Sequence, residues 1–181
     1  MMSLVSAFWL FVIFFGAVGG LRGWAKEILV IFAMILALAI DTLLRSYVPG
    51  FDLALSAGGA LSRFTIRAVF FIALAFFGYE SPAVSALIGG KARREKFQDI
   101  MLGAVLGAIN GYLIVGTIWY YMADSGYPVP GFINPADPRV AGLVDPSYQA
   151  YINILPPVLI GVPYIYFALV LAFLFVIIVF V

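Results

Sequence analysis

Five long apolar segments restrict what this chain can fold into. They cover Leu4–Leu21, Trp24–Leu44, Leu61–Tyr79, Ile100–Ala123 and Val158–Val181. Each has at least the ~17 residues that a helix needs to cross the hydrocarbon core of a bilayer. With 65% apolar and 10% charged residues, the chain has too little polar surface to cover a water-soluble fold. The sequence therefore predicts an all-α integral membrane helical bundle with about five transmembrane helices, surrounded by lipid.

Two missing residue types narrow the chemistry. The chain has no cysteine and no histidine, which removes disulfides, thiolate ligands and the usual acid/base group near neutral pH. No nucleophile and base stand at a motif spacing, and the acidic residues are scattered over both predicted surfaces. We therefore expect a protein that is not an enzyme and has no catalytic residue, metal or cofactor. A net charge of +1 indicates no nucleic-acid partner.

Basic residues predict the orientation. The first connection and the connection between the third and fourth segments lie on the same side of a five-span bundle. They hold Arg22, Lys26, Lys91, Arg93, Arg94 and Lys96, whereas the opposite connections hold Arg45, Arg63 and Arg139. The positive-inside rule then places the N-terminus outside and the C-terminus in the cytoplasm.

The connection over residues 124–157 is rich in proline, which prevents a long regular helix. We expect it to be an extracytoplasmic loop, with an amphipathic turn at Tyr148, Tyr151, Ile152 and Leu155 lying on the membrane surface. The fifth predicted transmembrane helix, 158–181, follows it.

Glycines recur at helical spacing in two segments. Gly103, Gly107 and Gly111 fall at intervals of four and line one stripe of the fourth segment, which lets a neighbouring backbone approach closely. The first segment is a plausible partner, because it offers Gly16 with Gly20 and Gly19 with Gly23. Packing within one bundle is the simpler interpretation. A seam between two copies and a surface that slides during transport are the alternatives.

Several polar side chains fall within or beside the apolar segments. Asn110 lies near the predicted bilayer midplane, where its amide needs a partner on another helix or a place in a polar conduction path. Arg63 and Arg67, and likewise Asp41 and Arg45, lie one turn apart near the outer interface. There we expect the long basic side chains to reach water and Asp41 to pair with an arginine.

Charged residues also interrupt the first two apolar segments, in GGLRGWAKEIL (19–29). Arg22 and Lys26 share one helix face, and Glu27 stands at a helix start. A turn at the inner membrane surface explains most of this pattern. Gly19–Gly20 and Gly89–Gly90 each precede a basic cluster, a carboxylate (Glu27 or Asp99) and a span, which is a weak sign of duplication.

The stretch GGLRGWAKEIL and the run DIMLGAVLGAINGYLIV (99–115) together resemble the colicin V production protein (CvpA) family. The matching residues are Arg22, Gly23, Glu27, Asp99, Leu102, Gly103, Gly107, Gly111, Leu113 and Ile114. Ile100 and Asn110 stand where the family has arginines, so the role of those arginines is not carried over. The resemblance covers residues 1–123 and implies a four-span CvpA-like membrane core, to which 124–157 and 158–181 are additions.

The resemblance implies a small protein of the bacterial inner membrane that is linked to toxin export and envelope physiology. It makes Arg22 and Glu27 candidates for an internal ion pair between the first two helices. Our hypothesis is a non-enzymatic protein that assists transport, in which Asn110, Arg67 and Glu27 converge on an interior cavity. The alternative is a structural accessory subunit of a larger membrane complex, for instance an energy-transducing assembly. Partners would then be other membrane subunits, or a second copy in a homo-oligomer.

Overall fold

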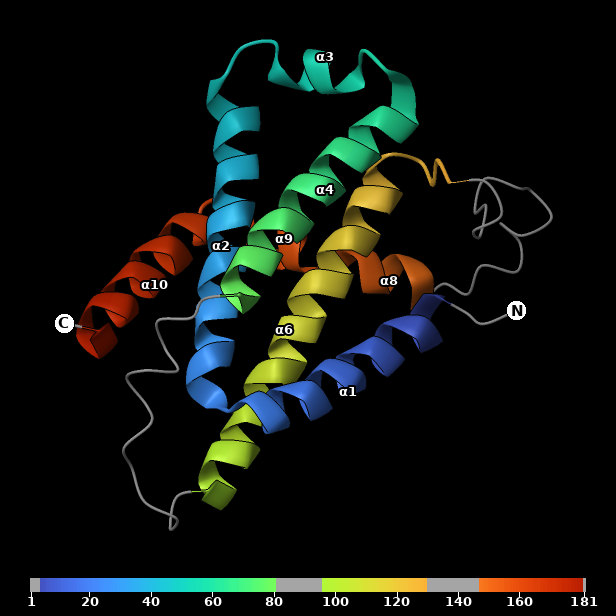
Figure 1. Cartoon of the computed structure of the whole chain (residues 1–181). Helices are drawn as coiled ribbons and strands as arrows, with labels where there is room; N and C mark the ends of the chain where they lie inside the picture. Colours follow the sequence, from blue (N-terminus) through green and yellow to red (C-terminus); the bar gives the residue numbers. More distant parts are fainter. Residues whose placement is uncertain (1–3, 81–95, 130–146, 181) are drawn as a thin grey trace.

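A computed structural model describes residues 4–80, 96–129 and 147–180, and over these ranges the chain contains helices and no strand (Figure 1). This confirms the predicted all-α fold. The basic residues Lys91, Arg93 and Arg94, and residues 130–146 of the proline-rich connection, lie outside the described residues.

Within the described ranges, four helices are long and apolar enough to cross a membrane. They are α1 (Leu4–Arg22), α2 (Trp24–Tyr47), α4 (Gly59–Tyr79) and α6 (Lys96–Asp124). Large apolar side chains such as Ile13, Val69 and Phe77 point outward from them, as expected of a surface that faces lipid. The chain is therefore a multi-pass membrane protein.

The helices alternate in direction, which gives the bundle two distinct ends (Figure 1). The α1–α2 junction at Gly23 and the start of α6 lie together at one end, which we call the Gly23 end. The short helix α3 (Phe51–Ser56) and the last residues of α6 lie at the other end, which we call the Asp124 end. The α1–α2 junction, which carries Arg22 and Lys26, and the start of α6, which carries Lys96, thus lie at the same end. Their assignment to the cytoplasm stays a prediction from the positive-inside rule.

The segment predicted as a fifth helix over Val158–Val181 is divided. Helix α9 (Pro156–Leu159) ends before Gly161, and α10 (Tyr164–Phe180) begins directly after Pro163. Glycine is a poor helix former and proline has no N–H to donate, which explains the break between them. Helix α10 runs beside α2, where the Phe173 ring meets the Phe32 ring edge to face. The crossing of the membrane by α10 stays a prediction.

The predicted surface turn near Tyr151 packs into the bundle instead. Its residues form most of α8 (Ser147–Asn153) and the segment that follows, up to Leu155. The Tyr151 ring stacks on Trp119 of α6, and Leu155 is fully buried. The Tyr112 hydroxyl donates to the Ile154 carbonyl oxygen. The turn is therefore packed against aromatic side chains of α6 and does not lie on the membrane surface as predicted. The side chain of Tyr148 lies outside the described residues.

Two apolar clusters form the core. One lies among α2, α4, α6 and α10 and contains Val30, Met34, Leu38, Phe71, Leu113 and Ile165. The other lies among α1, α6 and the segment before α9 and contains Phe8, Val12, Trp119, Met122 and Leu155.

Helix α1 packs chiefly on α6, and glycines make this contact close. A Cβ atom added to Gly19 would lie 2.6 Å from the Gly107 Cα, and one added to Gly111 would lie 2.8 Å from the Phe15 Cβ. One added to Gly103 would meet the Gly19 carbonyl oxygen. At Gly16 and Gly20 the nearest atoms are 3.3 and 3.4 Å away, which leaves more room. The glycine stripe of α6 therefore faces α1 within one bundle.

Candidate functional site

Arg22 and Glu27 meet at the Gly23 end. Arg22 is the last residue of α1, and Glu27 lies in the first turn of α2. Gly23 between them has φ +87°, a backbone conformation that favours glycine and lets the chain turn between the two helices. The Arg22 Nη1 atom lies 2.8 Å from Glu27 Oε1, and Arg22 Nη2 donates to the Tyr79 carbonyl oxygen at 2.8 Å. The guanidinium also lies 4.3 Å from the centre of the Tyr79 ring.

Asn110 completes this group. Its Nδ2 atom donates to Glu27 Oε2 at 2.6 Å and to the Glu27 carbonyl oxygen at 3.0 Å. Glu27 and Asn110 are both fully buried. Because both Glu27 atoms are acceptors, the nitrogen of the Asn110 amide has to face them. Arg22, Glu27, Tyr79 and Asn110 form what we call the Glu27 cluster, in which the buried carboxylate of α2 contacts α1 and α6, and Arg22 of α1 contacts α4.

Asp99 of α6 also lies at the Gly23 end and contacts the start of α2. Its Oδ1 atom accepts a hydrogen bond from the Trp24 backbone N–H at 3.1 Å. A carboxylate at the first turn of α2 satisfies a free N–H group and faces the positive end of the helix dipole. A Cβ atom at Gly23 would lie 3.0 Å from both carboxylate oxygens of Asp99. Gly23 therefore allows both the turn and the approach of Asp99.

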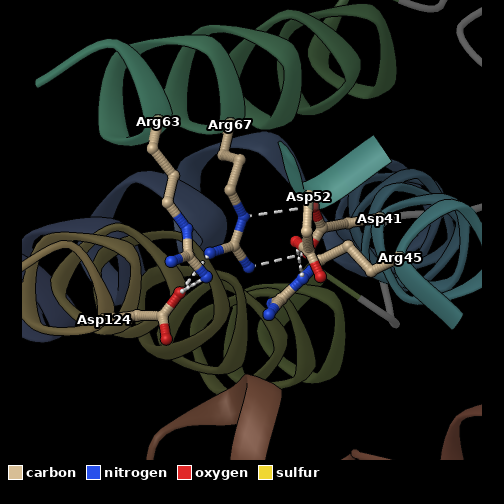
Figure 2. Close-up of polar contacts among 6 residues, drawn as sticks. All are labelled: Asp41, Arg45, Asp52, Arg63, Arg67 and Asp124. Atoms are coloured by element: carbon tan, nitrogen blue, oxygen red, sulfur yellow. Dashed lines mark hydrogen bonds and ion pairs between the residues drawn. The ribbon is translucent and has the colours of Figure 1, made fainter. Parts of the chain in front are cut away.

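A second charged group lies at the Asp124 end (Figure 2). Arg67 of α4 binds Asp41 of α2 through two hydrogen bonds, Nε to Oδ1 at 3.1 Å and Nη2 to Oδ2 at 2.8 Å. Its Nη1 atom donates to Asp124 Oδ2 at 2.7 Å, and Arg63 Nη2 donates to the same oxygen at 3.0 Å. We call Asp41, Arg63, Arg67 and Asp124 the Arg67 cluster.

The position of Arg67 differs from the prediction. We expected its side chain to reach water, but it is buried, and its guanidinium lies 3.9 Å from the centre of the Tyr121 ring. Two carboxylates and an aromatic face replace the water that the guanidinium loses. The expected pairing of Asp41 with an arginine is present.

A cavity of about 300 Å³ adjoins the Arg67 cluster. It is lined by Asp41, Arg45 and Arg67, by Pro157 of α9, and by Gly161 and Val162 from the break between α9 and α10. The ion pair between Arg45 Nε and Asp52 Oδ1, 2.9 Å long, stands beside it. Asp52 is half exposed, so the cavity opens at the Asp124 end. The six charged residues Asp41, Arg45, Asp52, Arg63, Arg67 and Asp124 sum to zero net charge.

The structure divides the predicted site residues between the two clusters. Glu27 and Asn110 are in contact, in agreement with the expected convergence. Arg67 lies in the other cluster. Its partner Asp41 stands fourteen residues beyond Glu27 on α2, which is about 21 Å along the helix. The expectation that Asn110, Arg67 and Glu27 converge on one cavity is therefore wrong.

Sequence reasoning gave no role to Asp124, Tyr79 or Thr117. The position of Asp124 in the sequence could have indicated its role. It follows Asn110 by fourteen residues, so the two side chains lie on nearly the same face of α6. Tyr79 contacts Arg22 through its backbone carbonyl oxygen and its ring. Neither contact can be predicted from the residue type alone.

Among the described residues, no group of three or more acidic side chains is placed to hold a metal ion. Comparison with protein-family models, with curated proteins and with solved structures finds no match for this chain.

Proposed function

We propose that this chain is a non-enzymatic, CvpA-like protein of the bacterial inner membrane that assists transport or export across the envelope. Its working part is the Arg67 cluster with the adjoining cavity. The observation that carries this proposal is a buried Arg67, held by Asp41 and Asp124, within a helical bundle whose outer surface is apolar.

Stability alone is a weak reason for such a cluster. Removing charges from water costs several kcal/mol per ion, and well-packed apolar side chains often stabilise a core equally well. Intramembrane charges are accordingly rare, and they concentrate on substrate and ion pathways.

The break between α9 and α10 supports the same interpretation. Irregular backbone at membrane depth is tolerated where it is buried in protein or lines a water-filled cavity. Gly161 and Val162 of this break line the same cavity as Asp41. Discontinuous helices beside buried charges are a recurrent feature of transporter binding sites.

A double substitution separates a transport role from a structural one. Asp41→Leu combined with Arg67→Met removes both charges and keeps the volume, while Asp124 keeps its contact with Arg63. We expect the variant to accumulate in the membrane but not to restore the envelope of a strain that lacks the gene. The readouts are entry of a membrane-impermeant DNA dye and growth in detergent. Thr65→Leu, at an exposed position of α4, is the control and should restore both.

Full restoration by the double variant would assign the cluster to folding and overturn the proposal.

The alternative is an accessory subunit of a larger complex, and one observation favours it. Helix α1 exposes large apolar side chains, among them Trp9, Phe11, Ile13 and Phe14. Lipid covers such a surface equally well, so purification in mild detergent decides between the two. Stoichiometric co-elution with other membrane proteins supports the subunit role, and elution alone or as a homo-oligomer supports the transport role.

A further inference from the structure

Four polar side chains of α6 lie on one face of the helix. At 100° per residue, Thr117, Tyr121 and Asp124 all project within about 40° of Asn110. Asn110 belongs to the Glu27 cluster, and Asp124 belongs to the Arg67 cluster. Asn110, Thr117 and Tyr121 are essentially fully buried. One face of one helix thus joins the two charged clusters.

Buried polar atoms on and near this face lack partners. Over the part of the chain that the structure describes, Asn110 Oδ1, Thr117 Oγ1 and the Tyr79 hydroxyl have no hydrogen-bond partner. Such groups are rare in folded proteins, and they are normally satisfied by internal water. Asn110 and Thr117 are about 10.5 Å apart along the helix, a distance that a short row of water molecules spans.

Each end of this face has access to water. The cavity beside Arg67 and Asp41 opens at the Asp124 end. At the Gly23 end, the side chain of Arg22 is 22% exposed while the carboxylate it contacts is fully buried. Water that reaches Arg22 at the Gly23 end is therefore separated from Glu27 by the Arg22 side chain alone.

We propose that this face of α6 is a path for protons and that Glu27 takes up and releases the proton. The proposal rests on the transport function above and specifies the species that moves. One proton enters beside Asp41 and Asp124, passes Tyr121 and Thr117 to Asn110, and binds a carboxylate oxygen of Glu27. One proton then leaves Glu27 for water at the Gly23 end. Each cycle moves one proton and leaves the protein unchanged.

The contacts of Arg22 suit this step. When Glu27 is neutral, its ion pair with Arg22 is lost, but Arg22 keeps the Tyr79 carbonyl oxygen and the Tyr79 ring. The guanidinium therefore stays beside Glu27, in position to pair again with the carboxylate after the proton has left.

The apolar core explains why the species is a proton. Between Asn110 and Thr117 lies Leu113, which packs with the buried residues Met34 and Phe71. A hydrated metal ion needs a wide opening there, whereas a proton needs only a transient row of water molecules. The flexible Met34 side chain is suited to admit them.

The test uses the purified chain in liposomes of phosphatidylethanolamine and phosphatidylglycerol that contain a pH-sensitive dye. A potassium diffusion potential drives protons inward. We expect proton entry to be faster than in protein-free liposomes. Thr117→Val should slow it roughly tenfold, the effect of about 1.4 kcal/mol added to the barrier.

Thr117→Val makes a sharp test because it keeps the shape of the side chain and removes an unpartnered buried hydroxyl. The variant should fold at least as well as the wild type. Thr65→Val makes the same change at an exposed position of α4 and should leave proton entry unchanged. Glu27→Gln, checked for a wild-type elution profile in detergent, should reduce proton entry to the protein-free rate.

Three results would overturn the proton path: entry no faster than in protein-free liposomes, a wild-type rate in Thr117→Val, or sodium entry as fast as proton entry. If the liposomes show no proton entry while Asp41→Leu/Arg67→Met still fails to restore the envelope, the transport function stands and the proton path falls. If proton entry follows Glu27 and Thr117 while the double variant restores the envelope, the path stands and the role of the Arg67 cluster falls.

Discussion

The amide nitrogen of Asn110 binds Glu27 twice, at Oε2 of the side chain and at the backbone carbonyl oxygen, over 2.6 and 3.0 Å. One side chain of α6 thus holds both the carboxylate and the first turn of α2. Through Arg22, the same carboxylate is tied to α1 and to the end of α4. This contact therefore helps to fix how the helices meet at the Gly23 end.

Asn110→Leu should destabilise the protein by about 1–3 kcal/mol, because it leaves a buried carboxylate oxygen without a donor. The midpoint of thermal unfolding in detergent measures the effect. Gln98→Leu removes an amide of similar size from an exposed position of α6 and should change the midpoint little. Equal midpoints for the two variants would contradict the assigned contact.

Arg67 and Arg45 both pair with aspartates at the Asp124 end, but they differ in burial. Arg67→Gln leaves Asp41 buried without its charge partner, so we expect a loss of about 3–5 kcal/mol. Arg45→Gln breaks a pair whose side chains are 28% and 51% exposed, and it should cost less than about 1 kcal/mol. Thermal unfolding at low and high salt separates them further, because salt screens only the exposed pair appreciably.

The close contact of α1 with α6 predicts unequal effects of alanine at two glycines. A Cβ atom at Gly107 would lie 2.8 Å from the Gly19 Cα, which is backbone and cannot turn aside. Gly107→Ala should therefore cost about 1–3 kcal/mol. At Gly20 the nearest atom is 3.4 Å away, so Gly20→Ala should stay within about 0.5 kcal/mol of the wild type. Thermal unfolding of the two variants side by side tests this, and a larger loss at Gly20 would reverse the assignment.

Much of the fold follows from the sequence because apolar length and glycine spacing act locally. Four of the predicted segments agree with α1, α2, α4 and α6 to within a few residues at most boundaries. The glycine stripe of α6 indicates which face packs closely. The break between α9 and α10 is harder to predict, because the run over 158–181 is almost uniformly apolar and Gly161 and Pro163 are short interruptions within it.

The site is less predictable because its contacts join residues far apart in the chain. Arg67 looks like an interfacial arginine until Asp124, which is 57 residues away, supplies a second carboxylate. Asn110 and Glu27 are 83 residues apart. Residue types show that each needs a partner, but only the packing of the helices shows which partner it finds.

The α1–α2 turn gives a last test, in which backbone strain is separated from side-chain contact. Gly23 (φ +87°, ψ 155°) and Gly50 (φ +81°, ψ −3°) both have positive φ, so alanine is strained at either position by about 1–3 kcal/mol. A Cβ atom at Gly50 would meet nothing within 4 Å, whereas one at Gly23 would lie 3.0 Å from both oxygens of Asp99. Gly23→Ala should therefore destabilise the protein more than Gly50→Ala.

Part of the difference should disappear when Asp99→Ala is added, because the crowded carboxylate is then absent. Thermal unfolding of the four variants, including Asp99→Ala alone, measures this coupling, and strict additivity of Gly23→Ala and Asp99→Ala would show that Asp99 does not press on the turn.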